Sequence, residues 1–221
     1  MRSSKQTLAP KQARSRESLN RLLRAAIEVL GQQGVAGATI PRIAAHAGLT
    51  PGAVYRRFRN KDVLIQTAIL RILEDQNKIL LLSLPIEASA QIPFASLAEQ
   101  IINSLVVSYR VNARLLRAIR QFLEGNEGTL FWKKASKLEM QTFEYMVNAL
   151  TRSHEIKHAD PRAATALGLV MIMGALWEIL VIPGDAKLWK VLMPKDDRSL
   201  KRELVSSFLS YLGIGQNLKE C

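Results

Sequence analysis

Residues 39–61 decide the fold and read Thr-Ile-Pro-Arg-Ile-Ala-Ala-His-Ala-Gly-Leu-Thr-Pro-Gly-Ala-Val-Tyr-Arg-Arg-Phe-Arg-Asn-Lys. Between Ile40 and Ala47 the apolar residues follow the spacing i, i+3, i+4, i+7, which predicts a short helix with one buried stripe. Thr39 is the expected N-cap of this helix. Gly48 is expected to end it in a left-handed conformation, so the chain turns sharply there.

A second short helix is predicted directly after the turn. Thr50 and Pro51 supply its cap and its first helical position. Val54 and Phe58 are about one helical turn apart and are expected to point inward. The opposite side of the helix then carries Pro51, Gly52, Tyr55, Arg56 and Arg59.

This outward side has the chemistry of a major-groove reader. An arginine such as Arg56 can bond to the edge of a guanine, a tyrosine hydroxyl can bond to a phosphate, and a glycine permits close approach. The free amides at a helix amino end also suit a phosphate. Asn60 is expected to cap the next helix, which begins at Lys61, and Arg57 is expected to contact a flanking phosphate. The stretch therefore predicts binding to double-stranded DNA.

The same run resembles the signature of the tetracycline-repressor (TetR) family. The shared positions extend from Thr39 through the second helix and continue in a Tyr-x-x-Phe-x-x-Lys-x-x-Leu pattern that ends at Leu64. A basic amphipathic helix immediately before Thr39 adds to the match. Beyond the first part of the chain, only length and helical layout agree with the family.

The resemblance implies an all-α protein with an amino-terminal three-helix DNA-binding module and a carboxyl-terminal helical module for effector binding and dimerisation, about nine helices in all. Arg56 and Arg57 replace the aromatic residue or histidine often found there, which leaves the operator sequence open. The family pattern implies phosphate contacts from Thr39, Thr50, Tyr55 and Lys61, and base contacts from Pro51, Gly52, Ala53 and Arg56.

Charge is concentrated in the same part of the chain. Residues 1–62 carry twelve Lys and Arg against three acidic residues, a net charge of +9 out of +12 for all 221 residues. A cationic module joined to a nearly balanced one is typical of a nucleic-acid binder with a second function. The single cysteine and a polar, basic start without an apolar leader predict a cytoplasmic, nucleoid-associated protein.

The predicted modules are residues 1–13 (a flexible basic arm), 14–62 (the DNA-binding module) and 63–221 (the effector and dimerisation module). The arm could follow phosphates or enter the minor groove, or it could have no role. Residues 14–33 predict a support helix ended by Gly31 and Gly34.

The larger module is predicted to be helical throughout. A helix from Lys61 to about Leu82 would leave the DNA-binding module as a lever, and residues 83–93 would form a linker. Further helices are predicted at about 94–110, 113–124 and 128–153 from their apolar periodicity.

Residues 163–182 form a nearly unbroken apolar run that approaches the ~20 residues needed to span a bilayer. Against a membrane-anchored protein stand Glu178 within the run and the soluble-style cap Asp160-Pro161. We therefore expect no membrane partner. Paired with a last helix at about 197–212, this segment predicts a hairpin, and the family dimerises through such a hairpin. The expected homodimer interface is thus 161–182 and 197–212.

The predicted interior of the larger module is rich in bulky, adaptable side chains, as expected for either a packed core or a pocket for an apolar small molecule. Glu178 is singled out because a carboxylate in an apolar run must find a partner, either an arginine or a ligand. The candidate ligand-binding residues are Tyr109, Phe122, Trp132, Met140, Phe143, Met171, Trp177 and Glu178.

One enzyme-like motif competes with this interpretation. His154-Glu155-Ile156-Lys157-His158 matches the His-Glu-x-x-His zinc pattern, which would make the chain a metallohydrolase. The segment lies at a polar helix end that Asp160-Pro161 closes. Glu178 could be imagined as a third ligand, but it would have to come from the middle of an apolar helix, and no substrate cleft is suggested. We expect no catalytic residues, no metal and no cofactor.

The sequence thus predicts a ligand-responsive, homodimeric DNA-binding repressor. It would bind a palindromic operator and be released by a small apolar effector.

Overall fold

Helices account for all the regular structure in the described part of this computed structural model, residues 8–84, 91–152, 155–183 and 191–214. A π-helical turn, η1 (Trp177–Val181), continues α8, and no strand occurs in these ranges, as the all-α prediction requires. The α-helices are α1 (Leu8–Gly37), α2 (Ile40–His46), α3 (Pro51–Tyr55), α4 (Lys61–Ser83), α6 (Phe94–Glu124), α7 (Leu130–Leu150), α8 (Pro161–Leu176) and α9 (Asp197–Tyr211).

Helix α1 extends beyond the predicted support helix at both ends. Residues 8–13, assigned from the sequence to a flexible arm, form its first turns, and residues 1–7 lie outside the described residues. Gly31 lies inside the helix and does not end it. The turn comes at Gly34, whose φ of 68° interrupts the helical path in the way that only glycine adopts without strain.

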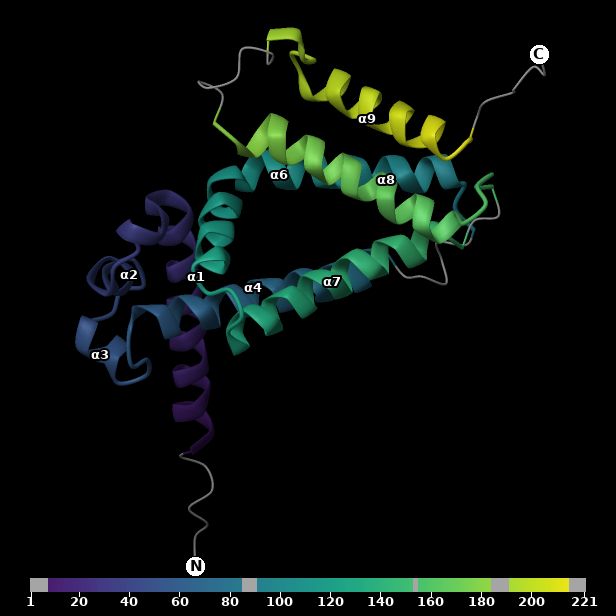
Figure 1. Cartoon of the computed structure of the whole chain (residues 1–221). Coiled ribbons are helices and arrows are strands. Elements are labelled where there is room, and N and C mark those ends of the chain that lie inside the picture. The colour runs from purple at the N-terminus through teal and green to yellow at the C-terminus, as the bar shows by residue number, and fades with distance from the viewer. Residues whose placement is uncertain (1–7, 85–90, 153–154, 184–190, 215–221) are drawn as a thin grey trace, which may run out of the picture.

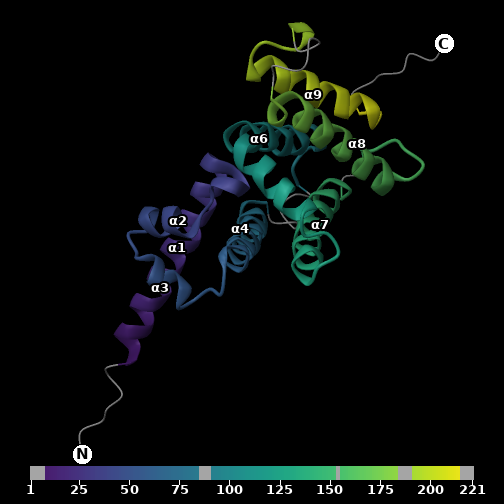
Figure 2. The same ribbon diagram turned by 60° about the vertical axis from the view of Figure 1, so that its left-hand side comes forward.

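Helices α1, α2 and α3 and the start of α4 form the head of the molecule, which Figure 2 shows on one side of the larger module. Its core is made of side chains that the periodicity of each helix turns inward. Leu22 and Leu30 of α1, Ile43 of α2, Val54 of α3 and Leu64 of α4 are fully buried. The head is therefore held by apolar packing around α1.

In the larger module, α4 and α7 lie side by side and run in the same direction (Figure 1). Asn77 of α4 donates to the Leu138 carbonyl of α7 at 3.1 Å, and the Tyr145 hydroxyl of α7 donates to the Leu84 carbonyl at 2.6 Å. These bonds tie the carboxyl-terminal part of α4 to α7.

Helices α6, α8 and α9 form a second layer across from the α4–α7 pair (Figure 1). The predicted break between residues 110 and 113 is wrong, because α6 is one continuous helix from Phe94 to Glu124. Near its middle α6 changes direction instead (Figures 1 and 2). Its first half packs on α9, and its second half reaches α1.

Two hydrophobic clusters divide the described residues. The first includes the core of the head, but it also contains Phe122 of α6 and Phe131 and Ala135 of α7. The second joins α6 to α7, α8 and α9. The head therefore shares its core with the ends of two helices of the larger module.

Helices α8 and α9 form the predicted hairpin. Gly168 of α8 is needed there, because a Cβ at this position would lie 2.6 Å from Phe208 of α9. Pro161–Val181 is long and apolar enough to cross a membrane by length and composition, a property that core helices of soluble proteins share. One side of α8 packs on α6 and α9. On its other side, Leu167, Val170 and Met171 stay exposed.

Candidate nucleic-acid interface

The turn between α2 and α3 has the geometry that its sequence predicts. Gly48 has a φ of 63°, the amide of Leu49 donates to the Ala44 carbonyl at 2.8 Å, and that of Gly48 donates to the Ala45 carbonyl at 3.1 Å. This pair of bonds is a Schellman motif, which satisfies the last carbonyls of α2. Thr50 then caps α3, since its hydroxyl oxygen accepts from the Ala53 amide at 3.2 Å. The turn fixes the angle at which α3 leaves α2.

Helix α3 has a buried side and a side open to solvent. Val54 is fully buried and Phe58 is 7% exposed, whereas Tyr55 is 58% exposed. Pro51, Gly52 and Arg56 are also exposed, and Ala53 is half-buried. Pro51, Gly52 and Tyr55 of the predicted outward side thus lie on one short, capped helix, with Arg56 as its C-cap and Arg59 beyond its end.

Neither the backbone conformation nor the packing of the described chain requires a glycine at position 52. A Cβ at this position would meet no atom within 4 Å, and the residue does not have a positive φ. A glycine costs helix stability relative to alanine. Its presence on the exposed side of α3 is consistent with close approach by a partner.

Arg57 and Lys61 are anchored to the backbone of α1. Arg57 donates to the Ser15 carbonyl at 3.0 Å, and Lys61 donates to the Val35 carbonyl at 3.2 Å. Arg57 also donates to the Ser15 hydroxyl at 3.3 Å, so both cations help to hold the head together. Thr39 precedes α2 and makes no side-chain cap bond, so its hydroxyl is available in the described structure. Asn60 caps α4 by accepting from the Val63 amide at 3.0 Å, as predicted.

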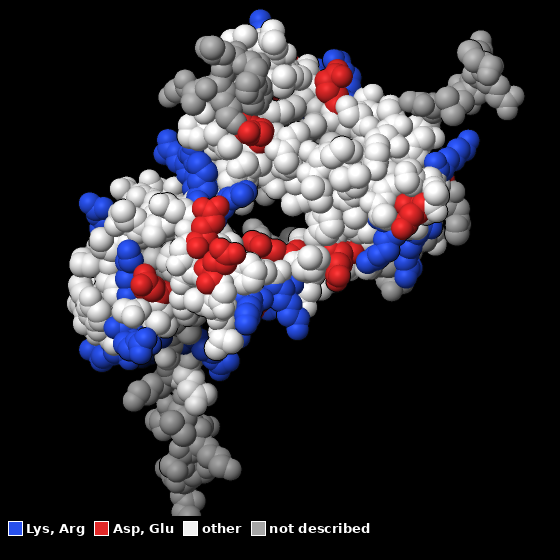
Figure 3. All heavy atoms as spheres, in the orientation of Figure 1, with Lys and Arg blue, Asp and Glu red and all other residues white. Residues whose placement is uncertain are grey.

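Figure 3 shows Lys and Arg side chains gathered over the head. Among the described residues, Arg56 and Arg59 take part in no ion pair. Their charges are therefore not neutralised within the described chain, and they can attract an anionic partner.

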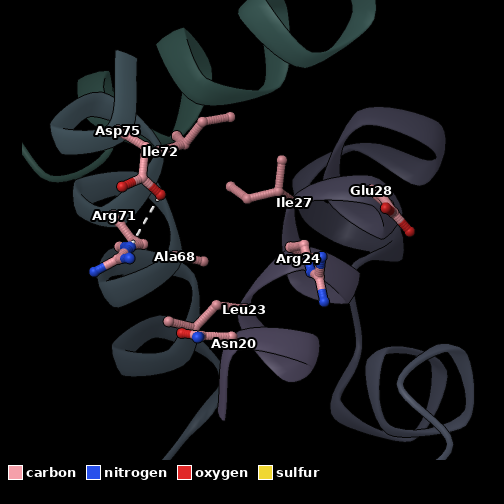
Figure 4. Close-up of a pocket in the computed structure, with 9 residues that line it drawn as sticks. All are labelled: Asn20, Leu23, Arg24, Ile27, Glu28, Ala68, Arg71, Ile72 and Asp75. Carbon is pink, nitrogen blue, oxygen red and sulfur yellow. Dashed lines mark hydrogen bonds and ion pairs between the residues drawn. The ribbon is translucent and has the colours of Figure 1, made fainter. Parts of the chain in front are cut away.

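A groove of about 360 Å³ runs between α1 and α4 on this head. Figure 4 shows Leu23 and Ile27 of α1 and Ile72 of α4 pointing into it. Arg71 and Asp75 form an ion pair of 3.0 Å on the α4 side. The groove between the two helices therefore has an apolar base and is open to solvent.

The eight residues predicted to bind a ligand do not gather at one place. Phe122 is buried in the first cluster, edge-to-face with Phe131 at 5.6 Å between ring centroids. Met171 is 47% exposed on the outside of α8, and Met140 is 55% exposed. Trp177 lies under the guanidinium of Arg120 at 4.7 Å, and Glu178 is half-buried.

Tyr109 and Phe143 pack at the edge of the second cluster, from α6 and α7. Figure 3 separately shows a hollow in the surface of the molecule, with acidic side chains along one edge. Trp132 of α7 is half-buried, and it lies two helical turns before Glu139 and three before Phe143. Tyr109 and Phe143 are the two members of the predicted ligand set that share this cluster edge.

Glu139 is a residue of this region that the sequence interpretation missed. Burial raises the pKa of the Glu139 carboxyl, and burial together with the nearby Glu139 charge raises the pKa of the Tyr109 hydroxyl. The helical spacing in the sequence could have pointed to Glu139, because it lies one turn before Phe143 on a predicted helix. What was missing was the neighbouring helix α6, which brings Tyr109 to the same place.

The zinc-like motif is not supported by the described residues. His154 lies outside them, and Glu155 accepts from the Phe94 amide at 3.1 Å. Residues 155–158 form a turn and coil after α7, so His158 does not lie on a helix. Among the described residues, no three His, Cys, Asp or Glu are placed to hold a metal.

Residues 22–68 match the family described as "Bacterial regulatory proteins, tetR family". Over 57 residues the chain is 42% identical to the HTH-type transcriptional regulators TtgW and SrpR of Pseudomonas putida. Each match covers 26% of this chain, and 42% of TtgW or 27% of SrpR. The chain thus spans less than half the length of these relatives.

The likeness to solved structures extends over almost the whole fold. A TetR-family transcriptional regulator from Mesorhizobium loti superposes with a TM-score of 0.68 at 19% identity, over 90% of this chain and 97% of that one. The regulator FadR from Bacillus subtilis, in complex with stearoyl-CoA, gives a TM-score of 0.60 at 19% identity, over 86% and 97%. At this identity the likeness concerns the fold.

Proposed function

Since the chain is a member of the TetR family by its amino-terminal region and its fold, we propose that it is a transcriptional regulator that binds double-stranded DNA through α3. The observation that carries this proposal is the exposed side of α3, where Gly52, Tyr55 and Arg56 stand together on a capped helix. Arginine reads guanine in the major groove, and tyrosine can position the helix on a phosphate. Thr39, Thr50, Arg57 and Lys61 would contact the flanking backbone.

The chain acts as a homodimer in this proposal. Leu167, Val170 and Met171 form an exposed apolar stripe on α8, beside α9. A second copy that covers this stripe would build a four-helix bundle from two hairpins. Two heads related by a two-fold axis would then read a palindromic operator.

A small molecule in the larger module would control operator binding. Tyr109, Trp132 and Phe143 are proposed to contact this ligand, and the packing of Tyr109 and Phe143 at the edge of one cluster supports the proposal. The regulator FadR, which shares the fold, holds stearoyl-CoA. We propose repression that is relieved by the ligand, in a cytoplasmic protein without enzymatic activity.

The shared core suggests how ligand and operator binding are linked. Helix α6 carries Tyr109 in its first half and Phe122, a member of the head's core, in its second half. A ligand that repositions α6 or α7 would move the contacts of Phe122 and Phe131 with the head. If the new position spaces the two heads wrongly for successive major grooves, operator affinity falls.

Substitutions on α3 separate base reading from backbone contact. Arg56→Ala is expected to weaken operator binding by ~1–3 kcal/mol and to relax specificity at one base position. Tyr55→Phe removes one neutral hydrogen bond, so it should weaken all sequences alike by about 0.5–1.5 kcal/mol. Gel-shift titrations against single-base operator variants measure both. Equal affinity of Arg56→Ala and wild type for every duplex would contradict the assignment of α3.

The operator itself can be found by selecting bound duplexes from a random pool with the purified protein. The expected product is a palindrome whose half-sites lie one or more DNA turns apart. Failure to enrich any sequence at low ionic strength would overturn the proposed function.

A further inference from the structure

We propose that the groove between α1 and α4 is a second ligand site, which binds a small organic acid with an apolar body. The carboxylate of this molecule lies against Arg24, and its apolar part covers the base of the groove. The groove is on the head, so the site is distinct from the effector site proposed for the larger module. Its ability to bind a ligand does not depend on the proposed function.

The groove has the size of a site for a small molecule. Its volume of about 360 Å³ falls within the range of roughly 300–1,000 Å³ that is usual for ligand pockets. Along α1 its lining runs from Asn20 to Glu28, a length of about 12 Å at the rise of an α-helix. A compact ring system matches this length better than a long alkyl chain does.

The base of the groove is apolar, and both helices contribute to it. Leu23 of α1 and Ala68 of α4 are buried and form its floor. Ile27 and Ile72 are half-buried and point into the groove from opposite walls (Figure 4). An apolar body that covers these two isoleucines removes their exposed surface from water, which favours binding.

The carboxylates that line the groove already have partners in the chain. Asp75 accepts from Arg71 at 3.0 Å, and the Glu28 carboxylate lies 2.6 Å from Nε2 of His46. Figure 4 also shows the Glu28 side chain pointing away from α4. Neither carboxylate therefore requires a cation from outside the protein.

Arg24 is the charged group of the groove that lacks such a partner. Within the part of the chain that the structure describes, it takes part in no ion pair. Its guanidinium is a planar fork of donors that matches a carboxylate. Asn20 lies one turn before it on the same side of α1, and the Asn20 amide can donate to the same anion. The groove thus favours an acid over an amine of the same shape.

Three probes with the same ring system test this preference. Naphthoate, naphthamide and naphthylmethylammonium differ in charge but share an apolar body of similar size. Binding to the whole protein is measured by calorimetry without DNA. We expect naphthoate to bind with a Kd below about 1 mM. It should bind about tenfold more tightly than naphthylmethylammonium, with naphthamide between them.

Two variants locate the bound probe. Arg24→Gln should weaken naphthoate about tenfold and leave naphthamide unchanged, because only the charged partner is lost. Ile27→Trp should fill the groove and abolish the binding of naphthoate.

The matched control is Arg21→Gln. It removes an exposed arginine of α1 that does not line the groove, so it should bind naphthoate like wild type. Circular dichroism checks that each variant keeps its helical content.

Four results would overturn the inference. They are the failure of naphthoate to bind, a preference for naphthylmethylammonium, equal affinity for naphthamide and naphthoate, and wild-type binding of naphthoate by Arg24→Gln or Ile27→Trp. Wild-type binding by Ile27→Trp would place the probe elsewhere, for example in the larger module. If Arg24→Gln instead weakens only the operator in gel shifts, Arg24 is a phosphate contact. Failure of the protein to bind any duplex would overturn the proposed function and leave this site standing.

Discussion

At the residue scale, Gly52 is the residue of α3 for which the described chain itself gives no structural reason. Its Cβ position is empty, and its φ does not require glycine. Gly52→Ala should therefore leave folding unharmed and add up to about 1 kcal/mol to the free energy of unfolding, because alanine favours a helix. The added methyl would project toward a DNA base or phosphate. We expect operator affinity to fall in gel shifts while the melting temperature holds or rises.

The contrasting glycine is Gly48, whose φ of 63° serves the turn itself. Gly48→Ala should lower the melting temperature, since alanine is strained at positive φ. If Gly52→Ala binds the operator like wild type, close approach at this position is excluded.

Glu139 makes a prediction about pH. Its folded-state pKa is raised above the ordinary value of 4.5 by burial. The folded protein thus holds this proton more tightly than the unfolded chain, so stability is lost as pH rises from the unfolded to the folded value. Glu139→Gln removes that loss. We expect a higher melting temperature than wild type at pH 7.5 and a smaller difference at pH 4.

Glu144→Gln controls for the loss of a carboxylate from α7, because Glu144 is exposed on the same helix. A melting temperature of Glu139→Gln that equals wild type at both pH values would mean that the carboxyl is fully hydrated.

At the element scale, several local signals in the sequence proved correct, although Gly31 does not end α1 and the Thr39 side chain makes no cap bond. The cap at Thr50, the left-handed stop at Gly48 and the cap at Asn60 each depend on a few adjacent residues, and each is present as predicted. The predicted break in α6 failed because no local residue ends the helix there. Likewise, Glu139 could not be placed without knowing which side of α7 meets α6. These features are set by packing between helices.

The outer side of α8 carries a prediction at this scale. Val170 is 54% exposed in the middle of the apolar stripe with Leu167 and Met171. Val170→Asp should prevent a second copy from covering the stripe, because a buried unpaired carboxylate is costly. The expected result is a monomer by analytical ultracentrifugation, normal helical content and weak operator binding. Ile79→Asp, on the exposed side of α4, should leave the assembly unchanged. Equal sedimentation of Val170→Asp and wild type would place the interface elsewhere.

At the scale of the whole molecule, the head and the larger module are joined by one apolar core. Phe122 of α6 and Phe131 of α7 meet edge-to-face at an angle of 74° and lie in the same cluster as Leu22 and Leu64 of the head. If the larger module binds an effector as proposed, its signal need not travel through α4 alone. It can pass through the buried ends of α6 and α7, because a packed core does not absorb displacements.

Phe122→Leu tests this connection. The smaller side chain should cost about 1 kcal/mol of stability while the head and the proposed effector site each keep their own residues. Effector binding without DNA and operator binding without effector should stay close to wild type. Their linkage should weaken by about 0.5–2 kcal/mol, so that the effector lowers operator affinity less, and the operator lowers effector affinity less by the same factor.

The matched control is Phe94→Leu, a phenylalanine that is fully buried in the second cluster, away from the head. It should cost similar stability and retain the linkage between effector and operator. If both variants keep full linkage, the shared core only holds the modules together, and α4 carries the signal. If Phe122→Leu alone loses linkage, the core that joins the head to α6 and α7 is the connection between the effector and the operator.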